Sequence, residues 1–209
     1  MNSTPKSREV VASQSGFTLA ELVVVVGIIL VVGGLSIPNL TRAIDTSRIK
    51  GAAQTLAAVY QDARIRATQQ NTSYEVLVSP VGITPAQICI DLDGDGTCSA
   101  SDSVTTLPAQ VTLNNNLGTG LKLGPPQLTF QTIDTEHSTA PAQGLMWNAV
   151  GLPCQSTAGG RCTATGWVQH LQMQRANGDV MYAAVTVTPT GRVKTWIFIP
   201  SGNGNGQWL

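Results

Sequence analysis

Apolar residues run almost unbroken near the start of the chain. Residues 22–37 carry no charge, and Glu21 is the sole ionisable side chain between residues 17 and 37. A helix of this length, rising about 1.5 Å per residue, matches the roughly 30 Å hydrocarbon core of a bilayer. The pattern predicts a transmembrane helix over residues 17–38, at whose end Pro38 removes a helical hydrogen bond.

Helical periodicity resumes after Pro38 and continues to about residue 72. Apolar residues recur there at steps of three and four, which predicts one buried face. The predicted face consists of Leu40, Ile44, Ile49, Ala52, Ala53, Leu56, Val59, Tyr60, Ala63 and Ala67. Residues 39–72 are therefore predicted to continue the first helix as an amphipathic half that packs beneath a sheet.

Short runs typical of β-strands, separated by turn residues, follow from residue 73 to residue 200. The predicted strands are 74–78, 88–90, 104–113, 127–133, 144–150, 166–174, 180–188 and 192–199. Turn pairs at residues 177–178 and 190–191 make the last three an antiparallel meander. Residues 201–209, rich in glycine and asparagine, are predicted to form a flexible tail. A long helix packed on an antiparallel β-sheet domain is an α+β fold.

Composition limits the classes of function. The 209 residues, 42 % of them hydrophobic, suit one globular domain plus an anchor. Twelve basic and twelve acidic residues give a net charge of zero, so any contact with nucleic acid must be local. The chain lacks a Gly-x-Ser-x-Gly elbow, a phosphate loop and a His-Glu-x-x-His motif, and His170 lies in a strand-like run with an expected structural role. We therefore expect no enzymatic activity.

Four cysteines form two closely spaced pairs. Cys89 with Cys98 and Cys154 with Cys162 fit two local disulfides in an oxidising compartment. A zinc site is the weaker alternative, because neither pair has the tight spacing of metal ligands and both histidines are distant in sequence.

An acidic loop follows the first cysteine. Asp91, Asp93, Asp95 and Asp102 occupy positions one, three, five and twelve of a calcium-loop pattern whose sixth position is Gly96. Four converging carboxylates repel one another unless a cation balances them. A structural calcium ion is one interpretation, and an Asp/Gly-rich turn held by a Cys89–Cys98 bridge is the other.

Glu21 is the unusual residue of the apolar segment. A carboxylate there costs about 2.5–3.5 kcal/mol on insertion scales, so it needs a partner or access to the headgroups. Upstream, residues 1–16 form a polar leader with Lys6 and Arg8, which predicts that this end stays cytoplasmic while the rest is exported.

Together, Gly16, Phe17 and Glu21 before an apolar run resemble the signature of type IV prepilins. The resemblance implies a pilin-like fold and cleavage between Gly16 and Phe17 by a prepilin peptidase, which also N-methylates Phe17. It implies that Glu21 pairs with the Phe17 amine of a neighbouring subunit during filament assembly. The expected partners are other pilins or pseudopilins and an inner-membrane assembly platform. The expected location is the inner membrane, in a single pass with a periplasmic domain, and then the filament.

Near the end of the chain, Gly191-Arg192-Val193-Lys194 resembles the C-terminal Gly-Arg-x-Arg motif of the FimT/GspH group of minor pilins and pseudopilins. The implied function is a structural component near the tip of a type IV pilus or type II secretion pseudopilus. The alternative is DNA capture during natural transformation, with Arg192 and Lys194 contacting phosphate and Trp196 stacking on bases. An ordinary solvated strand is the simpler interpretation of this segment. A third possibility is an anchored periplasmic binding module unconnected to filaments.

Overall fold

The computed structural model describes residues 16–78, 85–114, 145–156, 162–164, 166–175, 178–200 and 206–209. Of residues 35–39, 114, 155–156, 162–164 and 200 it describes the backbone alone. The chain divides into two compact units, residues 1–43 and residues 44–209. Residues 1–15 of the predicted leader and the predicted strand over residues 127–133 lie outside the described residues. The predicted α+β class is confirmed, with one long helix and two antiparallel sheets in the described part.

Helix α1 (Leu19–Gln70) contributes to both units and passes through Pro38 without an interruption in its helical backbone. Thr18 caps its first turn. At the other end Asn71 adopts a positive φ of 50°, and the Thr72 amide donates to the Ala67 carbonyl oxygen at 3.1 Å. This bond from the second residue past the helix satisfies a carbonyl group that the helix leaves open.

The predicted single-pass location in the inner membrane is contradicted. Within the described residues, no helix has both the length and the apolar character needed to cross a bilayer.

Within the described residues, six strands form the first sheet, in the order β3-β2-β1-β5-β6-β7. Every neighbouring pair is antiparallel. The strands are β1 (Tyr74–Val78), β2 (Gln87–Asp91), β3 (Ser103–Thr106), β5 (Leu145–Trp147), β6 (Pro153–Ser156) and β7 (Cys162–Ala164). Strand β1 lies between β2 and β5, so it brings together segments that are far apart in the sequence.

The second sheet, as far as the structure describes the chain, contains five strands in the order β11-β10-β9-β8-β4 and is also antiparallel. Its strands are β4 (Val111–Asn114), β8 (Trp167–Gln174), β9 (Val180–Val187), β10 (Val193–Pro200) and β11 (Gly206–Trp208). The predicted meander is confirmed in β8, β9 and β10. The predicted single strand over residues 104–113 is wrong, because it divides into β3 and β4, which belong to different sheets.

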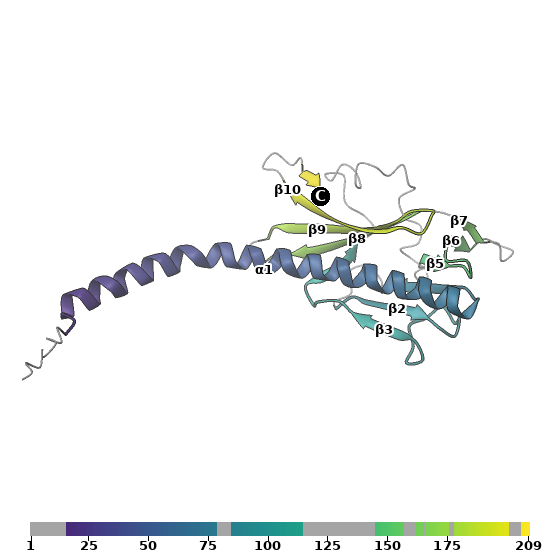
Figure 1. The fold of residues 1–209 in the computed structure, drawn as a ribbon, viewed down its shortest axis with the longest axis horizontal. Helices are drawn as coiled ribbons and strands as arrows, with labels where there is room; N and C mark the ends of the chain where they lie inside the picture. The colour runs from purple at the N-terminus through teal and green to yellow at the C-terminus, as the bar shows by residue number, and fades with distance from the viewer. Residues whose placement is uncertain are drawn as a thin grey trace, which may run out of the picture. The chain divides into compact units, whose positions relative to one another are not determined.

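The second half of α1 runs between the two sheets of its unit, with β8, β9 and β10 on one side and β2 and β3 on the other (Figure 1). One hydrophobic cluster joins helix and sheets, including Leu56, Ile88, Trp147 and Leu171. The predicted buried face of the helix is confirmed from Ile49 to Ala67. It is wrong at Leu40 and Ile44, which are 63 % and 42 % exposed.

The predicted flexible tail is also wrong in its last part. Residues 206–208 form β11, which pairs with β10 through Phe198↔Trp208 and Ile199↔Gln207. Trp208 is buried, and burying a side chain of this size supplies the stabilisation that a three-residue strand lacks on its own.

Candidate functional site

The residues of the predicted processing site lie at the start of the described chain. Gly16 and Phe17 precede α1, Phe17 is 83 % exposed, and no atom lies within 4 Å of a Cβ placed on Gly16. The peptide bond between them is therefore accessible to a processing enzyme.

Glu21 has a partner within its own chain. Its carboxylate accepts from the backbone amide and the hydroxyl of Thr18, both at 3.0 Å, and its own amide donates to the Thr18 hydroxyl at 3.2 Å. This reciprocal arrangement is a capping box at a helix N-terminus. The amide bond, followed by the hydroxyl bond, holds the pKa of the exposed Glu21 carboxyl below its ordinary value.

Downstream of Glu21, apolar side chains cover α1 on all sides. From Leu22 to Val32 the large apolar side chains are between 45 % and 70 % exposed. A helix that is apolar around its whole circumference is stable in water only when other surfaces cover it.

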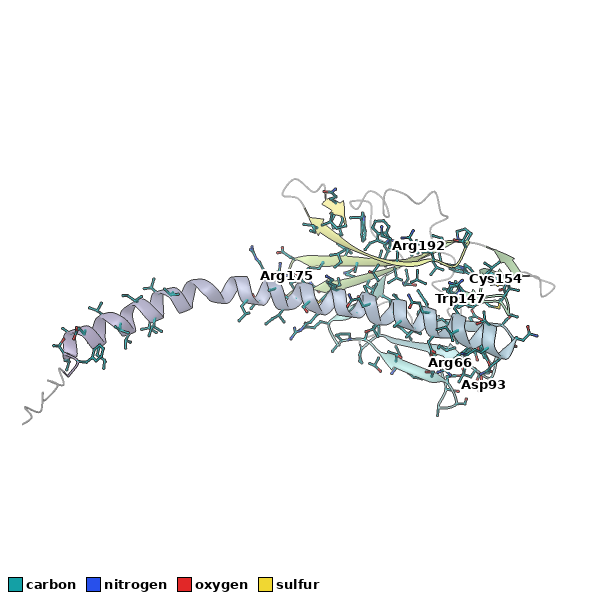
Figure 2. All side chains as sticks on the ribbon, viewed as in Figure 1. Arg66, Asp93, Trp147, Cys154, Arg175 and Arg192 are labelled. Carbon is teal, nitrogen blue, oxygen red and sulfur yellow. A yellow bond between two sulfur atoms is a disulfide. The ribbon has the colours of Figure 1, made fainter. Side chains whose placement is uncertain are left out.

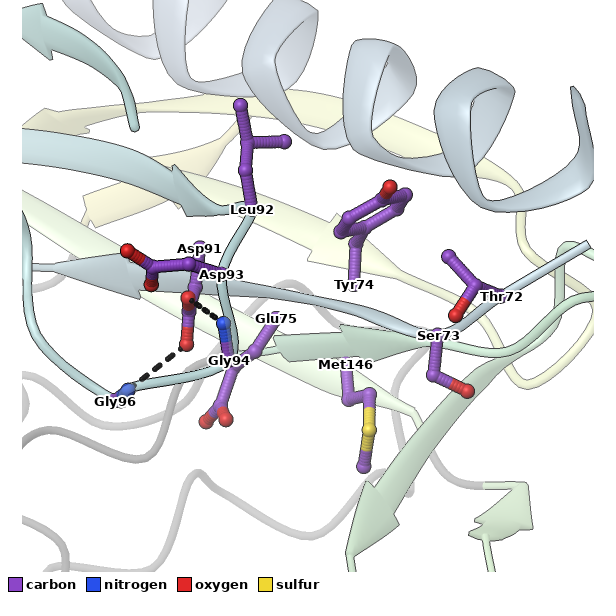
Figure 3. A pocket seen from close by; sticks show the side chains of 10 residues that line it. All are labelled: Thr72, Ser73, Tyr74, Glu75, Asp91, Leu92, Asp93, Gly94, Gly96 and Met146. Carbon is purple, nitrogen blue, oxygen red and sulfur yellow. Dashed lines mark hydrogen bonds between the residues drawn. The ribbon is translucent and has the colours of Figure 1, made fainter. Parts of the chain in front are cut away.

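The acidic loop after β2 brings its four predicted carboxylates together. One oxygen from each of Asp91, Asp93, Asp95 and Asp102 lies within 4.8 Å of the others. Asp91 is buried and accepts from the amides of Gly94 at 2.7 Å and Gly96 at 3.0 Å (Figure 3). The two glycines adopt φ values of +76° and +73°, which lets the backbone wrap around this carboxylate.

Asp102 closes the loop from its other end. It accepts from the amides of Leu92 at 2.9 Å and Ser99 at 2.7 Å, and these bonds lower the pKa of its carboxyl. Asp93 and Asp95 are exposed and accept mainly from hydroxyls and amides of the loop itself. Carboxylate oxygens gathered in this way are the ligands that calcium prefers, so these four residues could hold one ion.

Beside the loop lies a cavity of about 340 Å³ (Figure 3). It is lined by Asp91, Leu92, Asp93, Gly94 and Gly96 together with Thr72, Ser73, Tyr74, Glu75 and Met146. The last five were missed from the sequence. They come together because β1 pairs with both β2 and β5, and no local pattern encodes that pairing.

The Cys89–Cys98 disulfide is confirmed and joins β2 to the acidic loop. Cys154 is also disulfide-bonded. Its predicted partner, Cys162, lies in β7, which pairs with β6, but the Cys162 side chain is outside the described part.

The predicted DNA-contacting residues lie at the turn between β9 and β10 and along β10. Arg192, labelled in Figure 2, and Lys194 are exposed. Lys194 Nζ lies 3.5 Å above the centroid of the Trp196 ring, so both residues project to the same face as predicted. Trp196 itself is only 7 % exposed and its Nε1 donates to the Thr186 hydroxyl at 2.9 Å. The indole is therefore covered rather than presented to a nucleic-acid base.

His170 lies in β8, and its side chain is buried. Its ring centroid is 6.1 Å from that of Trp208, and its Nε2 has no hydrogen-bond partner within the described residues. Burial lowers the pKa of His170 to about 4, because the charged imidazolium loses its hydration.

No protein-family model, curated protein or solved structure matches this chain.

Proposed function

We propose that this protein is a filament subunit of the type IV pilin class, a minor pilin or pseudopilin. The observation that carries the proposal is the exposed apolar surface of α1 from Leu22 to Val32. In this proposal, the corresponding helices of neighbouring subunits cover that surface in the core of a filament. The domain formed by residues 44–209 is carried as the folded part of each subunit.

Energetics support such an assembly. Complete burial of a Val, Leu or Ile side chain is worth about 1.5–3 kcal/mol relative to exposure. Ten large apolar side chains are at least 45 % exposed in the isolated chain: Leu22, Val23, Val24, Val25, Val26, Ile28, Ile29, Leu30, Val31 and Val32. Partial burial of this set against other helices offsets the entropy of association. Gly27, Gly33 and Gly34, with no neighbour within 4 Å, permit close approach of another helix.

Glu21 gives the assembly its register. In the isolated chain its carboxylate is bonded to Thr18 at the exposed start of the helix. Surrounding apolar helices remove water from this carboxylate, which then requires an opposite charge. After cleavage behind Gly16, the amine of Phe17 on the next subunit supplies that charge, and the pairing fixes the axial offset between subunits.

The test compares Glu21→Ala with Thr18→Ala. Both variants break the capping box, but only the first removes the carboxylate. We expect Glu21→Ala to be cleaved normally and excluded from filaments, and Thr18→Ala to be cleaved and incorporated. Immunoblots of sheared filaments, with mass spectrometry of the N-terminus, measure both steps. Normal incorporation of Glu21→Ala, or a purified chain that still begins at Met1, would refute the proposal.

DNA capture remains an alternative with less structural support. Arg192 and Lys194 are exposed and available to phosphate, but Trp196 contributes to the packing of the second sheet. A role in scaffold assembly requires no exposed indole, which favours the filament proposal.

A further inference from the structure

Strand β11 is a short strand near the end of the chain that, among the described strands, pairs with β10 alone. It lies at the edge of the second sheet, where β10 is its neighbouring strand, and residues 201–205 join the two. Ile197 and Leu209 exchange two backbone hydrogen bonds of 3.0 and 2.9 Å. The strand is therefore a short extended segment that is bound to β10 as a peptide ligand binds to a sheet edge.

One side chain anchors this segment. Trp208 is 6 % exposed and packs in a cluster with Val168, Ala184, Trp196 and Phe198. Its ring centroid lies 5.3 Å from that of Phe198, within the range of favourable aromatic contacts. The pocket for Trp208 is built by β8, β9 and β10, so it belongs to the sheet and not to β11.

Gly206 adds selectivity to the edge. A Cβ placed on Gly206 would overlap the ring of Phe198. The backbone of β11 therefore lies directly against this ring, and a larger residue at this position would have to displace the Phe198 ring. A sheet edge, a tryptophan pocket and a glycine contact together define a site for a short strand with a glycine two positions before a tryptophan.

We propose that the outer edge of β10 with the Trp208 pocket is a strand-acceptor site, which in assemblies takes residues 206–208 of a second copy of this chain. The segment that occupies the site shows which ligand it accepts, and every copy carries that segment. A second copy would make the same backbone bonds, the same indole contacts and the same glycine contact. Exchange would therefore cost only release of the chain's own β11 from β10 and association of the two chains.

The chain concentration sets the balance between β11 bound to its own β10 and β11 bound to the β10 of a second copy. A short connection holds β11 at an effective concentration on the order of millimolar. At about 100 µM chain, roughly a tenth of the sites therefore hold the β11 of another copy. This fraction increases when copies are held side by side. The inference does not depend on the proposed filament role, because it can be tested on the purified full chain.

Cysteine trapping tests the proposal. Ile199 and Gln207 are direct cross-strand partners on β10 and β11, and both are exposed. One full-length chain carries Ile199→Cys and another carries Gln207→Cys, and the two are mixed at about 100 µM under mild oxidation. We expect a mixed disulfide dimer at roughly ten times the yield of a control mixture of Gln207→Cys with Thr195→Cys. Thr195 lies on the same strand but pairs with Val185 of β9.

A second substitution separates exchange from random collision. Trp208→Ala in the Ile199→Cys chain weakens the chain's own β11, so the mixed dimer should increase several-fold. The same substitution in the Gln207→Cys chain removes the anchor of the donated segment, so the dimer should decrease several-fold. Equal effects in the two chains, or a yield no greater than that of the control mixture, would overturn the proposal. Trp208→Phe, which keeps an aromatic anchor, should give smaller changes of the same signs.

Discussion

The guanidinium of Arg64 donates from Nη1 to the carbonyl oxygen of Gly191 at 2.9 Å and also lies 5.5 Å from the centre of the Trp147 ring. Gly191 belongs to the turn before β10, and Trp147 belongs to β5 of the other sheet. One helical side chain thus links α1 to both sheets. The carbonyl group of the glycine in the Gly-Arg-Val-Lys segment has a structural role here, because it accepts this hydrogen bond.

Arg64→Met should lower the free energy of unfolding by about 2–3 kcal/mol. It removes a charge-assisted hydrogen bond to a partly buried carbonyl group and a cation–π contact with a buried indole. Arg66→Met is the matched control. The Arg66 ion pair with Asp62 at 2.9 Å connects adjacent turns of the helix surface and should contribute about 0.5 kcal/mol or less. Equal losses in urea unfolding of the two variants would contradict the linking role of Arg64.

Gly191→Ala should destabilise more than Gly178→Ala. Both glycines adopt positive φ, +82° and +89°, so both alanines bear a backbone cost of about 1–2 kcal/mol. A Cβ on Gly191 would also lie 3.0 Å from both the Arg64 guanidinium carbon and the Gly151 carbonyl oxygen, whereas none of these contacts arises at Gly178. Crowding adds about 1–3 kcal/mol at Gly191. Equal denaturation midpoints for the two variants would argue against close packing at this turn.

His170 makes the protein sensitive to mild acid. Its pKa is about 4 in the folded protein and about 6.5 in an unfolded chain, so between these values the unfolded state binds the proton preferentially. The contribution of neutral His170 to the free energy of unfolding is complete above pH 6.5. Between pH 6.5 and pH 4 the free energy of unfolding decreases by about 1.4 kcal/mol per pH unit, about 3 kcal/mol in all. His170→Leu should lack this part of the pH profile of unfolding. Parallel profiles for parent and variant would exclude the effect.

Calcium should stabilise the acidic loop. At a concentration one hundred times its dissociation constant, an ion that binds only the folded state adds about 2.7 kcal/mol. We expect millimolar calcium to raise the melting temperature of the parent and leave an Asp93→Asn, Asp95→Asn variant unchanged. That variant retains Asp91 and Asp102, whose carboxylates hold the loop backbone. Magnesium, which prefers fewer protein ligands, serves as the control ion. An unchanged melting temperature for the parent would show that the turn needs no ion.

The DNA alternative makes a quantitative prediction. If Arg192 and Lys194 contact phosphates, replacing both with alanine should reduce the slope of log affinity against log salt by about two. An Arg42→Ala, Lys50→Ala variant loses the same charge from exposed positions on α1 and is the control. Identical gel shifts for the two double variants would remove the alternative.

Several elements could be predicted because their signals are local. The face from Ile49 to Ala67 repeats with the helical period, and glycines at positions 178 and 191 mark the turns between β8, β9 and β10. The Cys89–Cys98 disulfide closes a short loop. Each of these features depends on residues within a few turns or one hairpin of one another.

Trp196 shows why the rest could not be predicted. Alternation along β10 correctly placed Lys194 and Trp196 on one face, but it does not indicate what covers that face. The cover includes Trp208, which the glycine-rich composition around it had assigned to a flexible tail. The cavity beside Asp91 could not be predicted for the same kind of reason, because it depends on the pairing of β1 with β5, which are far apart in the sequence.

The position of α1 between two sheets also has a mechanical consequence. Residues from Ile49 to Ala67 contact both sheets along several turns, so tension along the helix axis loads these contacts simultaneously, in shear. Extraction of the helix would require them to break together, whereas a helix on an open surface would peel away turn by turn. The domain is therefore suited to withstand a pulling force that is applied along α1.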